Sequence, residues 1–141
     1  MRSIAKRALT RIAPLTLAFV LGACATQPPA VEMGELENAA DGTSITIKRG
    51  GELTVRLDAR LSTGFQWQGP TAVAPVLAPI GQPVYMNKAD DPRNLSQGGF
   101  NVFRFKGEQP GTTTLQFNYK RPWEANVAPA KSVRYTVVVA P

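Results

Sequence analysis

Apolar and polar residues alternate along much of the chain with a period of two. Leu53, Val55 and Leu57 are separated by the polar residues Thr54 and Arg56, so this segment has one apolar face. A period of two is typical of β-strands that bury one face. The same pattern occurs in segments 45–48, 53–58, 102–105, 113–120 and 133–139. No window after Gly34 shows the periodicity of an amphipathic helix.

Turn-forming residues separate these segments. The Gly-Gly pair at 50–51 and the Pro-Gly pair at 110–111 favour turns. Prolines at 70, 75, 79 and 83 divide the middle of the chain into pieces short enough for edge strands. We therefore predict an all-β fold, an antiparallel immunoglobulin-like β-sandwich of about 7–8 short strands over residues 37–141. A chain of this size buries roughly two-thirds of its unfolded surface, which is enough for one core without disulfides.

The first residues of the chain differ from the rest. Residues 1–11 contain four cations and no acid, and residues 12–23 are largely apolar. This apolar stretch is shorter than the ~20 residues that a membrane-spanning helix needs. A basic segment followed by a short apolar one and small residues is typical of a signal peptide. We place the signal peptide at residues 1–23 and exclude it from the fold.

Cys24 directly follows this segment and is the only cysteine. The sequence Leu-Gly-Ala-Cys at 21–24 resembles a bacterial lipobox, in which a peptidase cuts before a cysteine that carries diacylglycerol. The alternative is an ordinary signal peptide that contains a cysteine. The resemblance implies a membrane lipid partner through acylated Cys24, and Ala25 implies a bacterial cell envelope location, lipid-anchored at the outer membrane. Residues 24–36 then form the lipidated cysteine and a flexible tether.

The basic net charge depends on the signal peptide. The whole chain has 16 Lys+Arg, 10 Asp+Glu and a formal net charge of +6. Four cations lie within residues 1–11 and every acid lies after Cys24, so the mature chain has 12 cations, 10 acids and a charge of +2. No run of more than two cations remains. Nucleic acid is therefore not expected as a partner.

The chain contains no histidine and one cysteine. It offers no Ser-His-Asp or Cys-His catalytic set, no His-ligated zinc and no internal disulfide. Paired carboxylates could serve a glycosidase. However, Asp90 and Asp91 are adjacent beside Pro92, and Glu124 fits an exposed loop acid. We expect no catalytic residue, no metal, no cofactor and no enzyme activity.

Three segments have compositions that disfavour β-strands. Residues 61–67, Leu-Ser-Thr-Gly-Phe-Gln-Trp, contain turn-forming residues. Residues 90–99 are polar and end in a Gly pair, and residues 120–124 place a proline before a large aromatic residue. Each segment also has a purely structural interpretation: a hairpin closed by Gly64 with Trp67 in the core, a flexible Gly98-Gly99 turn, and a Trp123 cap on the sandwich.

Taken in order, these segments resemble the chagasin family of cysteine-peptidase inhibitors. The family's marks are Asn-Pro-Thr-Thr-Gly-Tyr/Phe-x-Trp, Gly-x-Gly-Gly and Arg-Pro-Trp. Residues 121–123 match the third mark fully, and residues 60–67 and 96–99 match the other two in part. The resemblance covers about residues 45–139.

The departures from the family pattern lie in the first two marks. Arg60, Leu61 and Ser62 replace Asn, Pro and the first Thr, and Ser96 replaces the first Gly of the second mark. We expect inhibition to survive these changes. We also expect selectivity to differ from that of a member with the full pattern.

The resemblance implies a proteinaceous, non-covalent inhibitor of papain-like cysteine peptidases, in which three loops at one end of the sandwich occlude the active-site cleft. Thr63 and Gly64 would lie over the catalytic cysteine of the enzyme. Gly98 and Gly99 would lie along the substrate groove on one side, and residues 121–123 would contact the enzyme surface on the other. The implied peptidase-binding residues are Ser62, Thr63, Gly64, Phe65, Gly98, Gly99, Arg121, Pro122 and Trp123.

A second hypothesis gives the same loops another role. A non-inhibitory envelope lipoprotein would use them to bind a protein or glycan partner. Aromatic candidates such as Trp123 keep a carbohydrate-binding role open. Inhibition assays against a panel of papain-like peptidases and a glycan-binding screen separate these hypotheses.

Overall fold

The structure, a computed structural model, describes residues 29–141 apart from residues 74 and 92. The described chain contains eight strands and two short 3-10 helices. The strands are β1 (Val31–Glu37), β2 (Ser44–Ala59), β3 (Gln66–Gln68), β4 (Leu77–Pro79), β5 (Val84–Asn87), β6 (Gly99–Gly107), β7 (Gly111–Lys120) and β8 (Lys131–Ala140). The 3-10 helices are η1 (Leu61–Thr63) and η2 (Leu95–Gln97). All the alternating segments lie in strands, so the predicted all-β class is confirmed.

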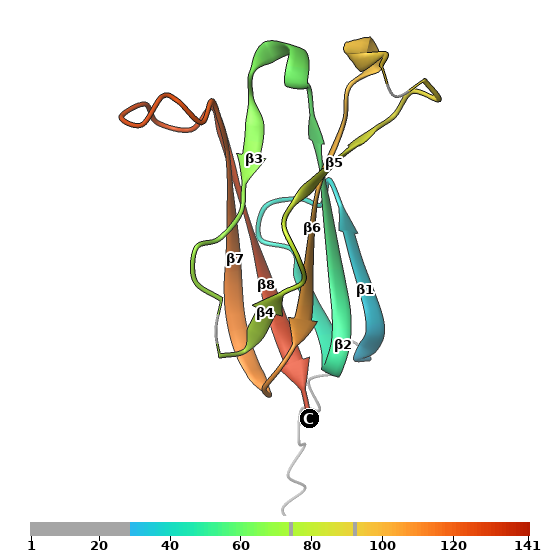
Figure 1. Cartoon of the computed structure of the whole chain (residues 1–141). Coiled ribbons are helices and arrows are strands. Elements are labelled where there is room, and N and C mark those ends of the chain that lie inside the picture. Colours follow the sequence, from blue (N-terminus) through green and yellow to red (C-terminus); the bar gives the residue numbers. More distant parts are fainter. Residues whose placement is uncertain (1–28, 74, 92) are drawn as a thin grey trace, which may run out of the picture.

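A bend in β2 lets one strand serve both halves of the sheet. The strand order is β3-β7-β8-β2-β6-β4, with β1 beside β2 and β5 beside β6. Residues 44–48 of β2 pair with β8, whereas residues 52–59 pair with β6. Between these parts Gly50 has a φ of +80°, a conformation that side-chain-bearing residues resist. The sheet therefore curls, and β6 and β7 face each other across the interior (Figure 1).

The expectation of a wholly antiparallel sheet is wrong. β1 pairs with β2 in parallel, and β2 pairs with β8 in parallel. The other strand pairs are antiparallel. Alternation shows which face of a strand is buried, but it carries no information on the direction of the neighbouring strand. The described sheet is therefore mixed and curled.

β1 occupies residues that the sequence suggested for the tether, so that expectation is wrong for residues 31–36. Only Gly34 and Leu36 of this strand are buried, and the strand is attached by backbone pairing with β2. A strand held in this way lacks the full apolar face that pattern analysis detects. The predicted signal peptide, Cys24 and the first part of the tether lie outside the described residues.

The core lies between the two halves of the curled sheet. Phe117 and Tyr135 are fully buried, and the rings of Phe103 and Phe117 have centroids 4.8 Å apart. The Tyr135 hydroxyl donates a 2.8 Å hydrogen bond to the carbonyl oxygen of Ala39, so its polar atom is satisfied. Burial and the nearby Asp41 carboxylate raise the pKa of Tyr135. This packing fixes the strand ends from which the loops emerge.

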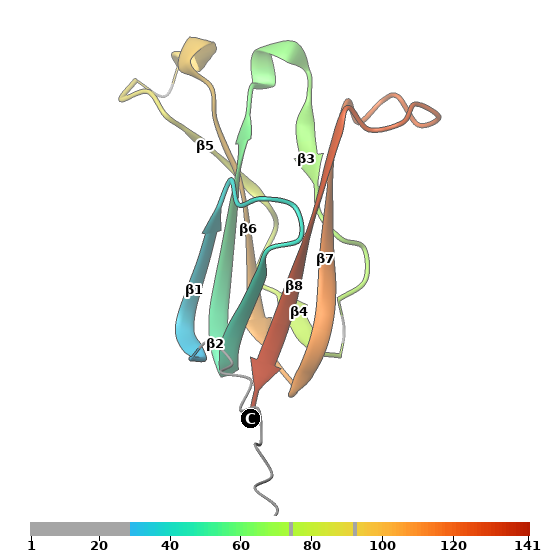
Figure 2. The same ribbon diagram turned by 180° about the vertical axis from the view of Figure 1, so that it is seen from behind.

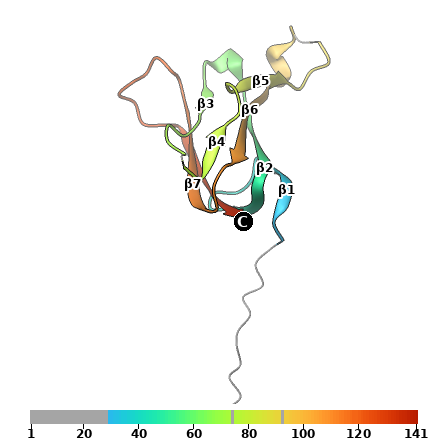
Figure 3. The ribbon, with the colours of Figure 1, turned by 60° about the horizontal axis from the view of Figure 1, so that its bottom comes forward.

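Three loops project from one end of the sheet (Figures 1 and 2). The β2–β3 loop lies between the β5–β6 loop and the β7–β8 loop. The beginning of β1 and the C terminus lie at the opposite end (Figures 1 and 3). Within the described part of the chain, no helix is long and apolar enough to cross a membrane. The fold thus gathers at one end three segments that are far apart in the sequence.

Candidate functional site

The β2–β3 loop is a tight turn held by its own hydrogen bonds. The Thr63 hydroxyl and the Thr63 backbone N–H both donate to the carbonyl oxygen of Arg60, at 2.7 and 3.1 Å. The Gly64 N–H donates to the carbonyl oxygen of Leu61 at 2.9 Å, and Gly64 has a φ of +78°. Gly64 therefore has a backbone conformation that residues with side chains resist. Ser62 and Thr63 are exposed at the tip of this turn.

Arg121 connects the β7–β8 loop to the β2–β3 loop. Its Nε donates a 3.3 Å hydrogen bond to the carbonyl oxygen of Thr63, and its guanidinium carbon lies 4.4 Å from the centre of the Phe65 ring. Its Nη1 also forms a 3.4 Å ion pair with Glu124. The side chain is half-buried by these contacts. Arg121 therefore holds two of the three loops in a fixed relation to each other.

Trp123 is exposed, but its position is fixed by local contacts. A β-turn places it, in which the Glu124 N–H donates to the carbonyl oxygen of Arg121 at 3.1 Å and Pro122 occupies the position that proline favours. The indole edge lies against Gly64, because a Cβ added to Gly64 would come 2.5 Å from Cη2 of Trp123. Trp123 nevertheless keeps 68% of its surface exposed. It presents a large aromatic face to solvent beside the β2–β3 turn.

Two aromatic residues below the loops support this arrangement. The Tyr119 ring stacks on Phe65 with centroids 5.3 Å apart, and it lies 5.0 Å from the Trp67 ring. Trp67 Nε1 donates a 2.8 Å hydrogen bond to the carbonyl oxygen of Asp58. Trp67 is therefore half-buried beside the core, as its structural interpretation suggested. The sequence did not single out Tyr119, and its position at the end of a strongly alternating strand was the only available signal.

The β5–β6 loop carries the two glycines predicted to contact a peptidase. Gly98 and Gly99 are both buried. A Cβ on Gly99 would collide with the carbonyl oxygen of Met86 and would lie 2.5 Å from Cζ of Tyr85. The carbonyl oxygen of Gly98 accepts a 3.0 Å hydrogen bond from the Lys88 N–H. The structure thus gives both glycines a role in packing the loop base, and their contact with a peptidase stays a prediction.

The exposed part of this loop lies directly before the glycines. Ser96 and Gln97 are exposed in η2. The Asn94 Oδ1 accepts hydrogen bonds from the Ser96 hydroxyl at 2.6 Å and from the Ser96 N–H at 3.2 Å. These bonds order the turn that faces the β2–β3 loop. Ser96, which departs from the family pattern, therefore has a local structural role.

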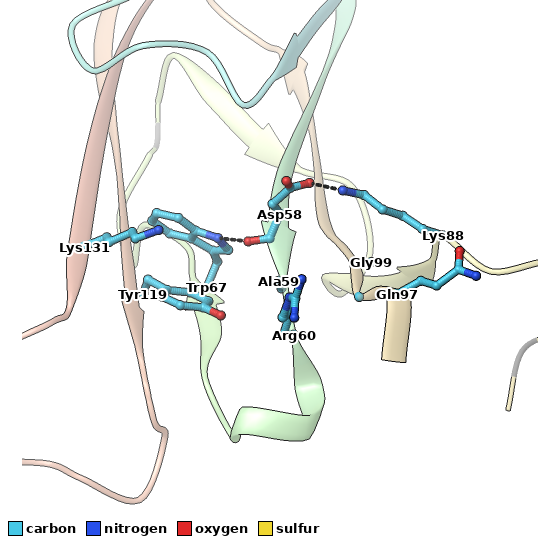
Figure 4. Close-up of a pocket in the computed structure, with 10 residues that line it drawn as sticks. Asp58, Ala59, Arg60, Trp67, Lys88, Gln97, Gly99, Tyr119 and Lys131 are labelled. Carbon is cyan, nitrogen blue, oxygen red and sulfur yellow. Dashed lines mark hydrogen bonds and ion pairs between the residues drawn. The ribbon is translucent and has the colours of Figure 1, made fainter. Parts of the chain in front are cut away.

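A cavity of about 280 Å³ lies below and between these loops (Figure 4). The Asp58 carboxylate lines it and forms a 2.7 Å ion pair with Lys88. Burial alone would raise the pKa of Asp58, but hydrogen bonds with Lys88 and Asn38 and the positive charge nearby hold it below its usual value. The remaining lining residues are Ala59, Arg60, Trp67, Gln97, Gly98, Gly99, Tyr119 and Lys131. The walls thus come from all three loops or their bases.

The described residues contain no group of three or more His, Cys, Asp or Glu side chains that could hold a metal ion. Cys24, the predicted lipid attachment point, lies outside the part of the chain that the structure describes. The site therefore consists of backbone turns, aromatic rings and cations, together with Asp58 and Glu124, each of which pairs with a cation. Such a set is suited to binding a protein surface rather than to activating a small substrate.

Comparison with known proteins gives one family and several similar structures. The family model described as "Chagasin family peptidase inhibitor I42" matches residues 46–137. The cysteine protease inhibitor EhICP2 from Entamoeba histolytica is similar with a TM-score of 0.62 and 24% identity, over 77% of this chain and 95% of that chain. Amebosin, known from a solution structure, has a TM-score of 0.60 and 24% identity, over 80% of this chain and 100% of that chain. These two likenesses show a shared fold. No curated protein matches.

Proposed function

The chain belongs to the chagasin family of peptidase inhibitors, and we propose that it is a non-covalent inhibitor of papain-like cysteine peptidases. The three loops at one end of the fold would enter the active-site cleft and occlude it. The curled sheet, in which β6 and β7 enclose the core, would correspond to the family's immunoglobulin-like sandwich. The enzyme would supply its own catalytic groups, and we assign no catalytic role to this chain.

The observation that carries this proposal is the connection between the first and third loops. Arg121 bonds to the Thr63 carbonyl oxygen and stacks on Phe65, so the two loops form one surface before any partner arrives. A preformed surface loses less conformational entropy on binding than separate mobile loops do. The proposed peptidase-binding surface comprises Ser62, Thr63, Gly64, Phe65, Arg121, Pro122 and Trp123, together with the β5–β6 loop.

The shape of the β2–β3 turn explains how it could resist cleavage. Peptidases bind substrates as extended strands that add to the cleft. Residues 61–63 instead form a 3-10 turn that ends in left-handed Gly64, which presents the backbone without an extended scissile bond. The Thr63 carbonyl oxygen is already bonded to Arg121. The turn can therefore approach the catalytic cysteine closely and remain intact.

The other two loops would hold the inhibitor on either side of the catalytic centre. Trp123 has the residue type and the exposure of an interface anchor, and Pro122 limits the entropy that its loop loses on docking. On the other side, Ser96 and Gln97 would lie along the substrate groove. Gly98 and Gly99 would contribute by fixing the backbone path at the base of the loop that carries Ser96 and Gln97.

The test of this proposal is an inhibition assay with the purified chain from Ala25 onward. It is titrated against a panel of papain-like cysteine peptidases, with a serine peptidase as the control. We expect inhibition that follows substrate competition, with the inhibitor recovered uncleaved. No inhibition of any cysteine peptidase at micromolar concentration would contradict the proposal, and it would favour the alternative of a non-inhibitory binding protein.

We also propose that the chain is a lipoprotein of the bacterial cell envelope, anchored at the outer membrane through acylated Cys24. The support is the basic and apolar N-terminal sequence, followed by residues 21–24, which resemble a lipobox. In addition, β1 begins at the end opposite to the loops, so an anchor before it would leave the loops facing away from the membrane. Mass spectrometry of the native protein should find an acylated cysteine, and Cys24→Ser should release the protein from membranes. An unacylated native Cys24 would contradict the anchor.

A further inference from the structure

The cavity between the loops contains more positive charge than its acid can balance. Asp58 and Lys88 form an ion pair of 2.7 Å and largely neutralise each other. Arg60 and Lys131 also line the cavity, and no second carboxylate does. Lys131 contributes to lowering the pKa of Asp58, so its charge acts inside the cavity. The cavity therefore holds two uncompensated cations.

These two cations differ from most others in the described chain. Arg60, Lys131 and Arg134 are the described cations whose side chains make no hydrogen bond and no ion pair with another described residue. Two of the three share this one cavity. Lys131 has a distant contact with the Tyr119 ring, 6.0 Å from its centroid. Two cations that line one cavity make the potential inside it positive, and this potential attracts an anionic group.

The aliphatic part of the Arg60 side chain is held in place by packing. A Cβ added to Gly98 would lie 3.3 Å from Cγ of Arg60, so the stem packs on the backbone of the β5–β6 loop. A guanidinium on a packed stem loses little freedom when it binds a carboxylate, and its planar donors match the two carboxylate oxygens. The aromatic side chains of Trp67 and Tyr119 line the same cavity. The cavity thus offers a directed cation beside two aromatic rings.

We propose that this cavity receives an acidic side chain from the rim of the peptidase cleft and thereby selects among target enzymes. The proposal rests on the function proposed above. Arg60 directly precedes the η1 turn, and Gln97 of the β5–β6 loop lines the same cavity. A partner that contacts both loops must therefore span the mouth of the cavity. Peptidases with a carboxylate at this point are favoured, and those with a cation there are rejected by Arg60 and Lys131.

The test compares inhibition constants of four variants against the peptidases that the wild-type chain inhibits. Arg60→Gln keeps the packed stem and removes the charge, and Lys131→Gln removes the second cation. Arg60→Lys keeps the charge, and Lys106→Gln removes an equal charge near the far end of β6. We expect Arg60→Gln and Lys131→Gln each to weaken inhibition of the most sensitive peptidase by about tenfold or more, as for close interface charge pairs. Arg60→Lys keeps the charge but not the planar donors, so it should recover only part of the inhibition that Arg60→Gln loses, and Lys106→Gln should have no effect.

The outcomes separate this proposal from the one on which it rests. If the wild-type chain inhibits no papain-like peptidase, the proposed function fails and the cavity proposal fails with it. If the wild type inhibits but Arg60→Gln matches it, or Lys106→Gln weakens inhibition equally, the cavity proposal alone is overturned. Thermal unfolding of each variant checks that its fold is retained.

A second arm distinguishes a peptidase carboxylate from a free small anion. Inorganic phosphate is titrated into the wild-type chain without peptidase, and the indole N–H signal of Trp67 is followed by NMR. We expect no saturation below about millimolar phosphate, because a small anion gains none of the surrounding interface. Saturation at lower concentration, together with loss of the Arg60→Gln effect in phosphate buffer, would make the cavity a small-anion site and overturn the proposal.

Discussion

The indole edge of Trp123 lies directly against the α-carbon of Gly64. A Cβ built on Gly64 would come within 2.5 Å of Cη2 and 3.1 Å of Cζ2 of the indole. Gly64 and Trp123 are nearly sixty positions apart in the sequence and lie in different loops. They come into contact because Gly64 has no side chain. Gly64 serves two needs at once, since its φ of +78° also ends the η1 turn. This contact sets the position of the largest exposed ring in the proposed peptidase-binding surface.

Replacing Gly64 by alanine should damage both stability and inhibition. The left-handed conformation costs a side-chain-bearing residue roughly 1–2 kcal/mol, and the added methyl must also displace the indole of Trp123. We expect the free energy of unfolding to fall by that amount and inhibition to weaken by about tenfold or more. Urea denaturation and inhibition constants measure the two effects.

Gly42→Ala is the matched control for this change. Gly42 has a φ of +84°, but nothing lies within 4 Å of the added Cβ. It should therefore lose similar stability without a change in inhibition. Equal inhibition by Gly64→Ala and wild type would show that the contact with Trp123 has no functional role.

Trp123→Ala should weaken inhibition with little effect on folding. A central aromatic anchor contributes about 2 kcal/mol or more to binding, whereas a side chain with 68% of its surface exposed buries little area in the free protein. The inhibition constant should therefore rise while the urea midpoint stays nearly unchanged. An unchanged inhibition constant in the folded variant would reject the anchor role.

Arg121 should act mainly by positioning the loops. Arg121→Ala removes the hydrogen bond to Thr63 and the stacking on Phe65, and we expect a loss of about 1 kcal/mol in stability together with weaker inhibition. Glu124→Gln removes only a partly exposed ion pair and should change either quantity by less than about 0.5 kcal/mol. A double-mutant cycle of Arg121→Ala with Phe65→Leu should show coupling. Additive effects would argue that Arg121 contacts the peptidase directly instead.

Asp58 predicts a pH dependence of stability. Burial raises its pKa, but the hydrogen bonds with Lys88 and Asn38 outweigh this and place the pKa below the ordinary 3.8. A carboxyl group with a lowered folded-state pKa stabilises the fold above the ordinary value, and this contribution is lost as the pH falls through the folded-state pKa. The stability difference between wild type and Asp58→Asn should therefore narrow below about pH 3.8. A difference that stays constant or widens there would contradict this assignment.

Gly99→Ala tests the structural role of the second glycine pair. The added methyl would collide with the Met86 carbonyl oxygen and lie 2.5 Å from the Tyr85 ring. Overpacking of this kind costs about 1–3 kcal/mol, so the urea midpoint should fall clearly. A variant as stable as wild type that inhibits less would instead place the role of Gly99 in the interface.

The alternating pattern predicted the strands well because it reports burial, residue by residue, on each face. It could not show that residues 31–37 form β1, since only Gly34 and Leu36 are buried there. It also could not show that β1 pairs in parallel with β2, because alternation carries no information on strand direction. The loops were located from Gly64, Gly98, Gly99 and the Arg-Pro-Trp segment. The residues that pack beneath the loops could not be located from the sequence in this way. The stacking of Tyr119 on Phe65 and the placement of Arg60 and Lys131 on one cavity depend on tertiary contacts between distant segments.

The central claim is that the loops occupy the active-site cleft without covalent chemistry. Its most direct test is calorimetric titration of the purified chain into a papain-like peptidase whose catalytic cysteine is replaced by alanine. Binding should be one-to-one, and it should disappear when a peptide inhibitor already fills the cleft. Binding that persists with the cleft filled, or no binding at micromolar concentration to a peptidase that the chain inhibits when active, would contradict the account.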